Sequence, residues 1–69
     1  MIQTVIKNVK NGEFIRFKDS ESSPMWIREN YERSCRKYSL ISYEDSCKEL
    51  FRNGSCLCYV ENEDSLINK

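Results

Sequence analysis

Apolar and polar residues are spaced through the first eighteen positions in a way that predicts a β-hairpin. The stretch from Gln3 to Lys18 divides into two short β-prone runs separated by Asn11-Gly12. Asn-Gly accepts the positive φ angles of a tight two-residue turn, so the two runs are expected to pair as antiparallel neighbours. In that register Ile6 lies opposite Phe17.

A second hairpin is predicted in the middle of the chain, after a polar loop over residues 19–24 that contains a proline. Its first strand runs from Met25 to Arg33, its turn is formed by residues 34–36, and its second strand runs from Lys37 to Ile41. Apolar residues do not alternate strictly along the first strand. This irregularity indicates a bend or bulge near Glu29-Asn30.

Residues 43–52 carry a helical pattern. Ser42 precedes acidic residues, a combination that favours the N-terminus of a helix. Apolar side chains then recur on one helical face, at Tyr43, Cys47, Leu50 and Phe51. Gly54 supplies a residue that readily ends a helix. We therefore expect one short helix over about residues 43–52, packed against the sheet.

The run from Cys56 to Val60 is continuously apolar, which predicts an inner strand or a strand with a helix on one side. Residues 61–69 lose periodicity and are expected to form a frayed acidic tail. The predicted order is β-β-β-β-α-β. The expected fold class is α+β, mainly β. It is a single domain over residues 1–60, built as a curved antiparallel sheet or small open barrel with one helix.

The charge of the chain limits the kinds of partner it attracts. Eleven Lys and Arg residues balance eleven Asp and Glu residues among the 69, and histidine is absent. This balance gives no long-range attraction to nucleic acid or to an anionic membrane. The charges are uneven, however, because residues 1–40 carry a basic surplus and residues 41–69 an acidic one. A mildly basic surface is expected if the fold separates these segments.

Four cysteines, at positions 35, 47, 56 and 58, raise the question of disulfides or a metal. The first residues lack the apolar run of a secretory leader, so we expect a cytoplasmic chain with reduced thiols. Disulfide pairing and a four-thiol zinc site remain open alternatives, although the spacing is not that of zinc knuckles. No apolar run is long enough to span a bilayer, and no membrane partner is expected.

Catalysis is not expected. Without histidine, a general base has to be a carboxylate, a lysine or a thiolate of shifted pKa. The only glycines, Gly12 and Gly54, fit turn or cap roles, so no phosphate-binding loop is present. We predict a chain that is not an enzyme and that holds no cofactor and no metal.

The candidate binding residues interleave aromatic rings with cations on the central hairpin, at Trp26, Arg28, Tyr31, Arg33, Arg36, Lys37 and Tyr38. Small curved sheets bind single strands through such residues, by stacking and phosphate contacts. The same residues also suit ordinary packing with a solvated outer face. Aromatic residues and arginines are equally typical of a protein interface, and a free strand edge offers a route to a homodimer.

Several short motifs resemble small proteins of unassigned function from bacteriophages and mobile elements. They are Asn11-Gly-Glu-Phe-Ile-Arg-Phe-Lys-Asp19, Trp26-Ile-Arg28, Tyr31-x-Arg-Ser-x-Arg-Lys-Tyr-Ser39, Tyr43-x-Asp45, Gly54 and Tyr59-Val60. The likeness covers about residues 10–60. It departs at Asn30, where many such sequences have glycine. The resemblance implies a protein made in the cytoplasm of a bacterial host, with no catalytic residues to carry over. Such proteins often inhibit or modify host defence enzymes and polymerases.

Two functions follow as hypotheses. The first is a non-catalytic phage-type accessory protein that binds a host protein, of the defence, transcription or replication machinery, and modulates or inhibits it. The alternative is a small domain that binds single-stranded nucleic acid or RNA through residues 26–38.

Overall fold

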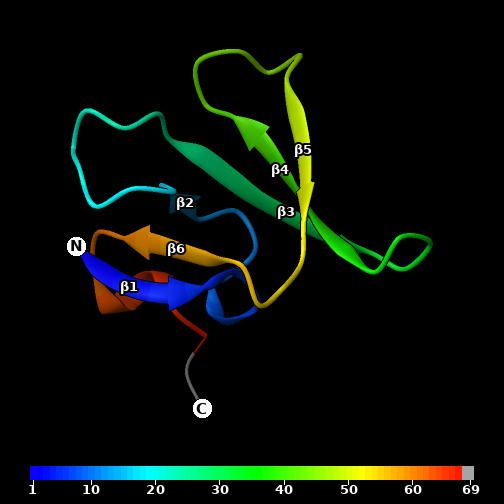
Figure 1. Ribbon diagram of the computed structural model, residues 1–69, viewed down its shortest axis with the longest axis horizontal. Coiled ribbons are helices and arrows are strands. Elements are labelled where there is room, and N and C mark those ends of the chain that lie inside the picture. Colours follow the sequence, from blue (N-terminus) through cyan, green and yellow to red (C-terminus); the bar gives the residue numbers. More distant parts are fainter. Residues whose placement is uncertain (68–69) are drawn as a thin grey trace.

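The computed structural model describes residues 1–67 and has six strands in two antiparallel sheets, with very little helix (Figure 1). β1 pairs with β6, and the second sheet has the order β2-β3-β4-β5. The strands are β1 (Ile2–Val5), β2 (Phe14–Ile15), β3 (Trp26–Glu32), β4 (Lys37–Ser42), β5 (Glu49–Arg52) and β6 (Leu57–Val60). Two short 3₁₀ turns complete the described chain, η1 (Ile6–Asn8) and η2 (Glu63–Ser65).

The central hairpin is confirmed, and so is its irregularity. β3 and β4 pair over most of their length, but the register shifts between Arg28, which lies opposite Leu40, and Tyr31, which lies opposite Tyr38. Three steps along β3 therefore match two steps along β4, which is the signature of a bulge at Glu29-Asn30. The Asn30 side-chain oxygen accepts a 2.7 Å hydrogen bond from the Asn11 side-chain amide, which fixes its position.

The predicted N-terminal hairpin is wrong, although its turn is present. The Glu13 N–H donates to the Lys10 carbonyl at 3.2 Å, and Gly12 has a φ of 90°. The arms on either side do not pair with each other, because β1 pairs with β6 and Ile6 donates its N–H to the Cys56 carbonyl. The apolar β6 is a better partner than the local arm, since it lets the chain bury side chains from both ends in one core.

The predicted helix over residues 43–52 is also wrong. The Ser42 hydroxyl does accept from the Asp45 N–H at 3.3 Å, as a helix cap would, but only a turn follows. The chain then returns as β5 and pairs with β4, with Leu50 opposite Leu40. A helix of ten residues is marginal by itself, whereas the open edge of β4 supplies hydrogen bonds and a buried contact.

β6 is a strand, as predicted, but only one of its faces is covered. Cys58 and Val60 are buried, while Leu57 is exposed.

Beyond β6 the chain packs back through η2. The Asn62 side chain accepts from the Asp64 N–H, and the Ile67 N–H donates to the Asn8 carbonyl. The expected frayed tail covered residues 61–69. Through residue 67 the chain is packed, and residues 68–69 lie outside the described part.

The core is small and draws on both sheets. Its fully buried residues come from the first fifteen positions, from β4 and from β6: Ile6, Val9, Ile15, Leu40, Cys58 and Val60. The molecule is flat, with extents of 31 × 31 × 17 Å. So thin a body keeps much of its sheet surface outside the core. Within residues 1–67, no helix has the length and apolar character required to cross a membrane.

Candidate functional site

The four-stranded sheet has two chemically different faces. Residues that lie opposite each other share a face, and neighbouring residues along a strand point to alternate faces. The strand pairing therefore assigns each side chain to one face of the sheet. The inner face packs on the core and includes Ile15, Trp26, Arg28, Tyr31, Tyr38, Leu40, Leu50 and Arg52. The outer face includes Phe14, Ile27, Ile41, Lys37, Glu49 and Phe51.

The structure divides the candidate binding residues of the central hairpin among three places. Trp26, Arg28, Tyr31 and Tyr38 are on the inner face, and Arg28 and Tyr38 are in contact. Arg33 and Arg36 are exposed in the β3–β4 turn, and Lys37 is on the outer face opposite Glu32. The seven residues therefore do not form one continuous surface.

Trp26 has a packing environment. It is half-buried against the core, and its ring lies 6.3 Å from that of Phe17, between centroids, at an interplanar angle of 60°. The two rings flank a hollow of about 390 Å³ that is otherwise lined by the polar loop before β3. No charged group other than Lys18 lines this hollow, so it offers few polar contacts to orient a ligand.

The ring of Tyr38 is the centre of a group of cations and aromatic residues, here called the Tyr38 cluster: Lys7, Arg28, Tyr31, Tyr38 and Arg52. Arg28 Cζ lies 4.3 Å from the Tyr38 ring centroid, and the Tyr31 ring lies 4.9 Å away, edge to face. Arg52 is opposite Tyr38 in the β4–β5 pair. Lys7 is adjacent across Gly54, where an added Cβ would lie 2.9 Å from Tyr38 Cε1 and 3.0 Å from Lys7 Cβ.

Arg28 is unusual because it is buried without a countercharge. It is 9% exposed, and its Nε has no hydrogen-bond partner. Within residues 1–67 the one ion pair joins Arg16 to Glu61, at 3.0 Å. The cation–π contact with Tyr38 offsets part of the cost of burying Arg28, but an unpaired N–H in the interior remains unfavourable.

The outer face carries an exposed apolar group, here called the outer patch: Phe14, Ile27, Ile41, Tyr43 and Phe51. Phe14, Tyr43 and Phe51 are 40%, 60% and 38% exposed. The rings of Phe14 and Tyr43 meet edge to face with centroids 5.3 Å apart. β2, β5 and the residue after β4 thus bring aromatic side chains from distant parts of the sequence to one side of the sheet.

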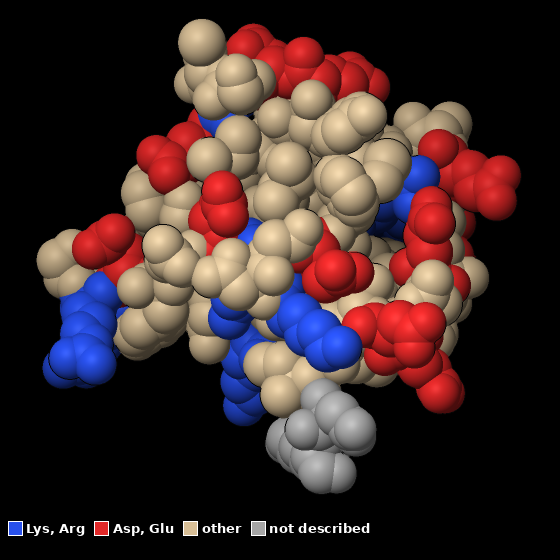
Figure 2. Space-filling view, turned by 180° about the vertical axis from the view of Figure 1, so that it is seen from behind, with Lys and Arg blue, Asp and Glu red and all other residues tan. Residues whose placement is uncertain are grey.

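Carboxylates accompany the outer patch. Glu29, Glu32 and Glu49 line a hollow of about 250 Å³ together with Ile41 and Ser39, and the Ser39 hydroxyl donates to Glu49. Seen from behind, the molecule has a broad uncharged area flanked by Asp and Glu side chains, and the Lys and Arg side chains visible on this face lie mostly toward its lower and left parts (Figure 2).

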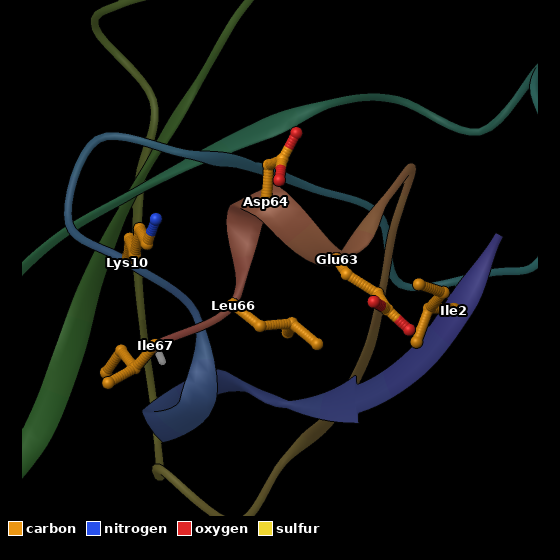
Figure 3. Close-up of a pocket in the computed structure, with 6 residues that line it drawn as sticks. All are labelled: Ile2, Lys10, Glu63, Asp64, Leu66 and Ile67. Atoms are coloured by element: carbon orange, nitrogen blue, oxygen red, sulfur yellow. The ribbon is translucent and has the colours of Figure 1, made fainter. Parts of the chain in front are cut away.

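Another hollow lies elsewhere, beside the last described residues. Its volume is about 440 Å³, and it is lined by Ile2, Lys10, Glu63, Asp64, Leu66 and Ile67. Figure 3 shows that the side chains of Glu63 and Asp64 point in different directions and that Lys10 stands apart from both. Because the three charges do not converge, the hollow has no arrangement for holding a ligand.

The cysteines are all free, with Cys35 and Cys47 exposed and Cys58 buried. Burial, with a smaller contribution from the neighbouring thiol of Cys56, raises the pKa of Cys58 to about 11, which keeps this thiol protonated at neutral pH. Within the described part of the chain, no three His, Cys, Asp or Glu residues are grouped so as to hold a metal ion.

Sequence reasoning missed the outer patch for an identifiable reason. The predicted helix turned Tyr43 and Phe51 inward, toward the sheet, whereas the strand β5 turns Phe51 outward. Lys7 and Arg52 were missed as neighbours of Tyr38 because both contacts depend on the long-range return of the chain through β5 and Gly54.

Comparisons of the chain with family models, with curated proteins and with solved structures found no match.

Proposed function

We propose that this chain is a non-catalytic accessory protein of phage type that binds and modulates a bacterial host protein through its outer patch. The observation that carries the proposal is the set of three exposed aromatic rings on one face of the sheet, bordered by carboxylates. The resemblance of residues 10–60 to phage and mobile-element proteins suggests the host context.

Exposed aromatic side chains that rest on a rigid sheet are effective binding residues. Phe and Tyr expose a large area, and few torsions are lost when they bind. Phe14 and Tyr43 already restrain each other through their edge-to-face contact, which lowers the entropy lost on binding. These rings therefore supply a preformed apolar contact surface for a partner.

The carboxylates specify the chemistry of the partner. Glu29, Glu32 and Glu49 give this face an acidic border, and Lys37 is the one cation paired into it from β4. A nucleic-acid backbone is repelled by such a border. A protein surface that combines apolar side chains with lysines or arginines is complementary to it, and that is the partner we propose.

The face of the sheet is favoured over its open edge as the contact surface. β5 is an edge strand, and an added strand would need its outward-pointing carbonyls. The Phe51 carbonyl already accepts from the Arg52 guanidinium at 2.9 Å, so an incoming strand has to displace this contact. A homodimer through the β5 edge meets the same obstacle.

The test is a capture experiment from bacterial lysate that compares matched surface variants. Wild-type protein is expected to retain a saturable host protein. Phe51→Ala and Tyr43→Ala are each expected to weaken its retention by about 30-fold, since truncating a central interface aromatic costs about 2 kcal/mol. Both residues are exposed, so the variants should remain folded.

Leu57→Ala is the matched control, because Leu57 is also a large exposed apolar residue but lies on β6, outside the patch. It should capture the same protein as wild type. Capture that survives both aromatic substitutions, or that is lost equally in the control, would count against the outer patch as the binding surface.

A further inference from the structure

We propose that the Tyr38 cluster is a second binding site that holds a phosphate of single-stranded nucleic acid with its adjoining base stacked on Tyr31. This site is on the inner face of the sheet and does not depend on the function proposed for the outer patch. Four observations support it: the buried unpaired cation, the surrounding positive charge, the exposed ring and the bulge that joins them.

The first observation is Arg28. Its guanidinium lies over Tyr38 and is 9% exposed, yet its Nε has no partner and no carboxylate pairs with it in residues 1–67. A buried cation of this kind is stabilised by an anion that supplies the missing hydrogen bonds. Phosphate oxygens match the planar fork of a guanidinium.

The second observation is that cationic residues from three separate segments neighbour Tyr38, with the Arg28 guanidinium in contact with its ring. Arg28 comes from β3, Arg52 from β5 and Lys7 from η1. Glu29, the acid next to Arg28 in the sequence, lies on the outer face. Glu13, whose carbonyl accepts from the Arg28 N–H, has a carboxylate that already accepts from Ser65 Oγ at 2.8 Å. The chain as a whole is neutral, but this site has a local surplus of positive charge.

The third observation is the exposed ring of Tyr31. It is 46% exposed, although it lies edge to face against Tyr38, so one side of the ring is supported by protein and the rest faces solvent. A ring held in this way is a platform for a planar base.

The bulge brings these groups together. In a regular strand, residues 28 and 31 would point to opposite faces. The extra residue at Glu29-Asn30 turns both Arg28 and Tyr31 toward Tyr38, and it leaves Glu29 and Glu32 on the outer face. Cations and carboxylates that alternate in the sequence are thereby separated onto opposite faces.

Single-stranded nucleic acid fits this arrangement better than other phosphate-bearing ligands. Cations beside an aromatic platform match the repeating unit of a single strand, which is a phosphate with an adjoining base. A duplex keeps its bases stacked inside, so it can reach the cations but not the ring. Arg28, Lys7 and Arg52 neighbour Tyr38, and Arg52 exchanges its contact with the Phe51 carbonyl for a phosphate oxygen when it binds. We therefore expect two or three phosphate contacts and a slope of log K against log salt of about −1.4 to −2.1.

The experiment measures binding of a fluorescent ten-residue oligothymidylate by anisotropy, in low salt and over a salt series. Wild type is expected to bind with the slope given above. Tyr31→Ala should weaken binding by about 5- to 150-fold, which corresponds to the ~1–3 kcal/mol of one stacked base. Arg52→Gln should weaken it and make the salt slope shallower by about 0.7.

Arg28→Met keeps an unbranched apolar stem, removes the guanidinium with its charge, and should reduce binding to background. If this variant does not fold, Tyr31→Ala and Arg52→Gln still test the binding site, because both residues are exposed and their substitution leaves the fold intact. Arg33→Gln is the matched control, since it removes one exposed charge from the same hairpin outside the cluster, and it should bind as wild type does.

Three outcomes would overturn the proposal. One is no binding in low salt. Another is an equal loss in Arg33→Gln and Arg52→Gln, which means non-specific attraction. The third is competition by inorganic phosphate or by duplex DNA that is as strong as competition by unlabelled single strand, which means an anion site without base stacking.

Discussion

At the scale of single residues, the contacts around Tyr38 explain features that had other interpretations in the sequence. Gly54 was assigned to the end of a helix, but no helix precedes it. Its actual constraint is the close approach of the Tyr38 ring and Lys7. The ring itself has little room to move, because Arg28 lies over it and Tyr31 meets it edge to face.

Substitution of Gly54 tests this constraint. Gly54→Ala places a methyl group 2.9 Å from the Tyr38 ring and is expected to lower the free energy of unfolding by about 1–3 kcal/mol, as in an overpacked core. Urea denaturation gives the value. Ser55→Ala, at the neighbouring exposed position, should change stability by less than about 0.5 kcal/mol. A Gly54→Ala protein as stable as wild type would mean that the ring does not pack there.

At the scale of elements, prediction succeeded where the signals were local. The β3–β4 hairpin, its bulge and β6 follow from strand-like residue types and from a break in alternation, both of which can be seen within a few residues. The Asn11-Gly12 turn was correct for the same reason. Its arms were assigned to each other wrongly, because the pairing of β1 with β6 depends on a segment more than fifty residues away.

The error at residues 43–52 has a related cause. Ser42, acidic residues and spaced apolar side chains favour a helix locally, but the open edge of β4 decides the structure. The choice of candidate site residues was likewise correct only in part, because it used residue type and local position alone. Arg28, Tyr31 and Tyr38 were chosen from residue type and do meet, whereas Arg33, Arg36 and Lys37 do not join them.

Two neighbouring substitutions distinguish the strand β5 from a helix. In the strand, Leu50 points inward and packs on the core, while Phe51 points outward. Leu50→Ala should therefore lower the free energy of unfolding by about 2 kcal/mol, and Phe51→Ala by less than about 1 kcal/mol. Denaturant midpoints of the two variants provide the comparison. In a helix both residues face the sheet, so equal and large losses would contradict the strand.

At the scale of the whole molecule, a neutral chain separates its charges by face. The outer patch is apolar with carboxylates at its border, and the Tyr38 cluster on the inner face is aromatic and basic. The sequence showed an uneven distribution of charge along the chain but not this separation, which arises from strand alternation and one bulge. Under the two proposals, two different ligands bind on opposite faces of a body 17 Å thick.

The most direct test of this account measures both ligands with the same two variants, Phe51→Ala and Tyr31→Ala. We predict that Phe51→Ala loses capture of the host protein and binds oligothymidylate with wild-type affinity. Tyr31→Ala should show the reverse. If either substitution weakens both interactions to a similar extent, the two faces are not separate binding surfaces and the account is wrong.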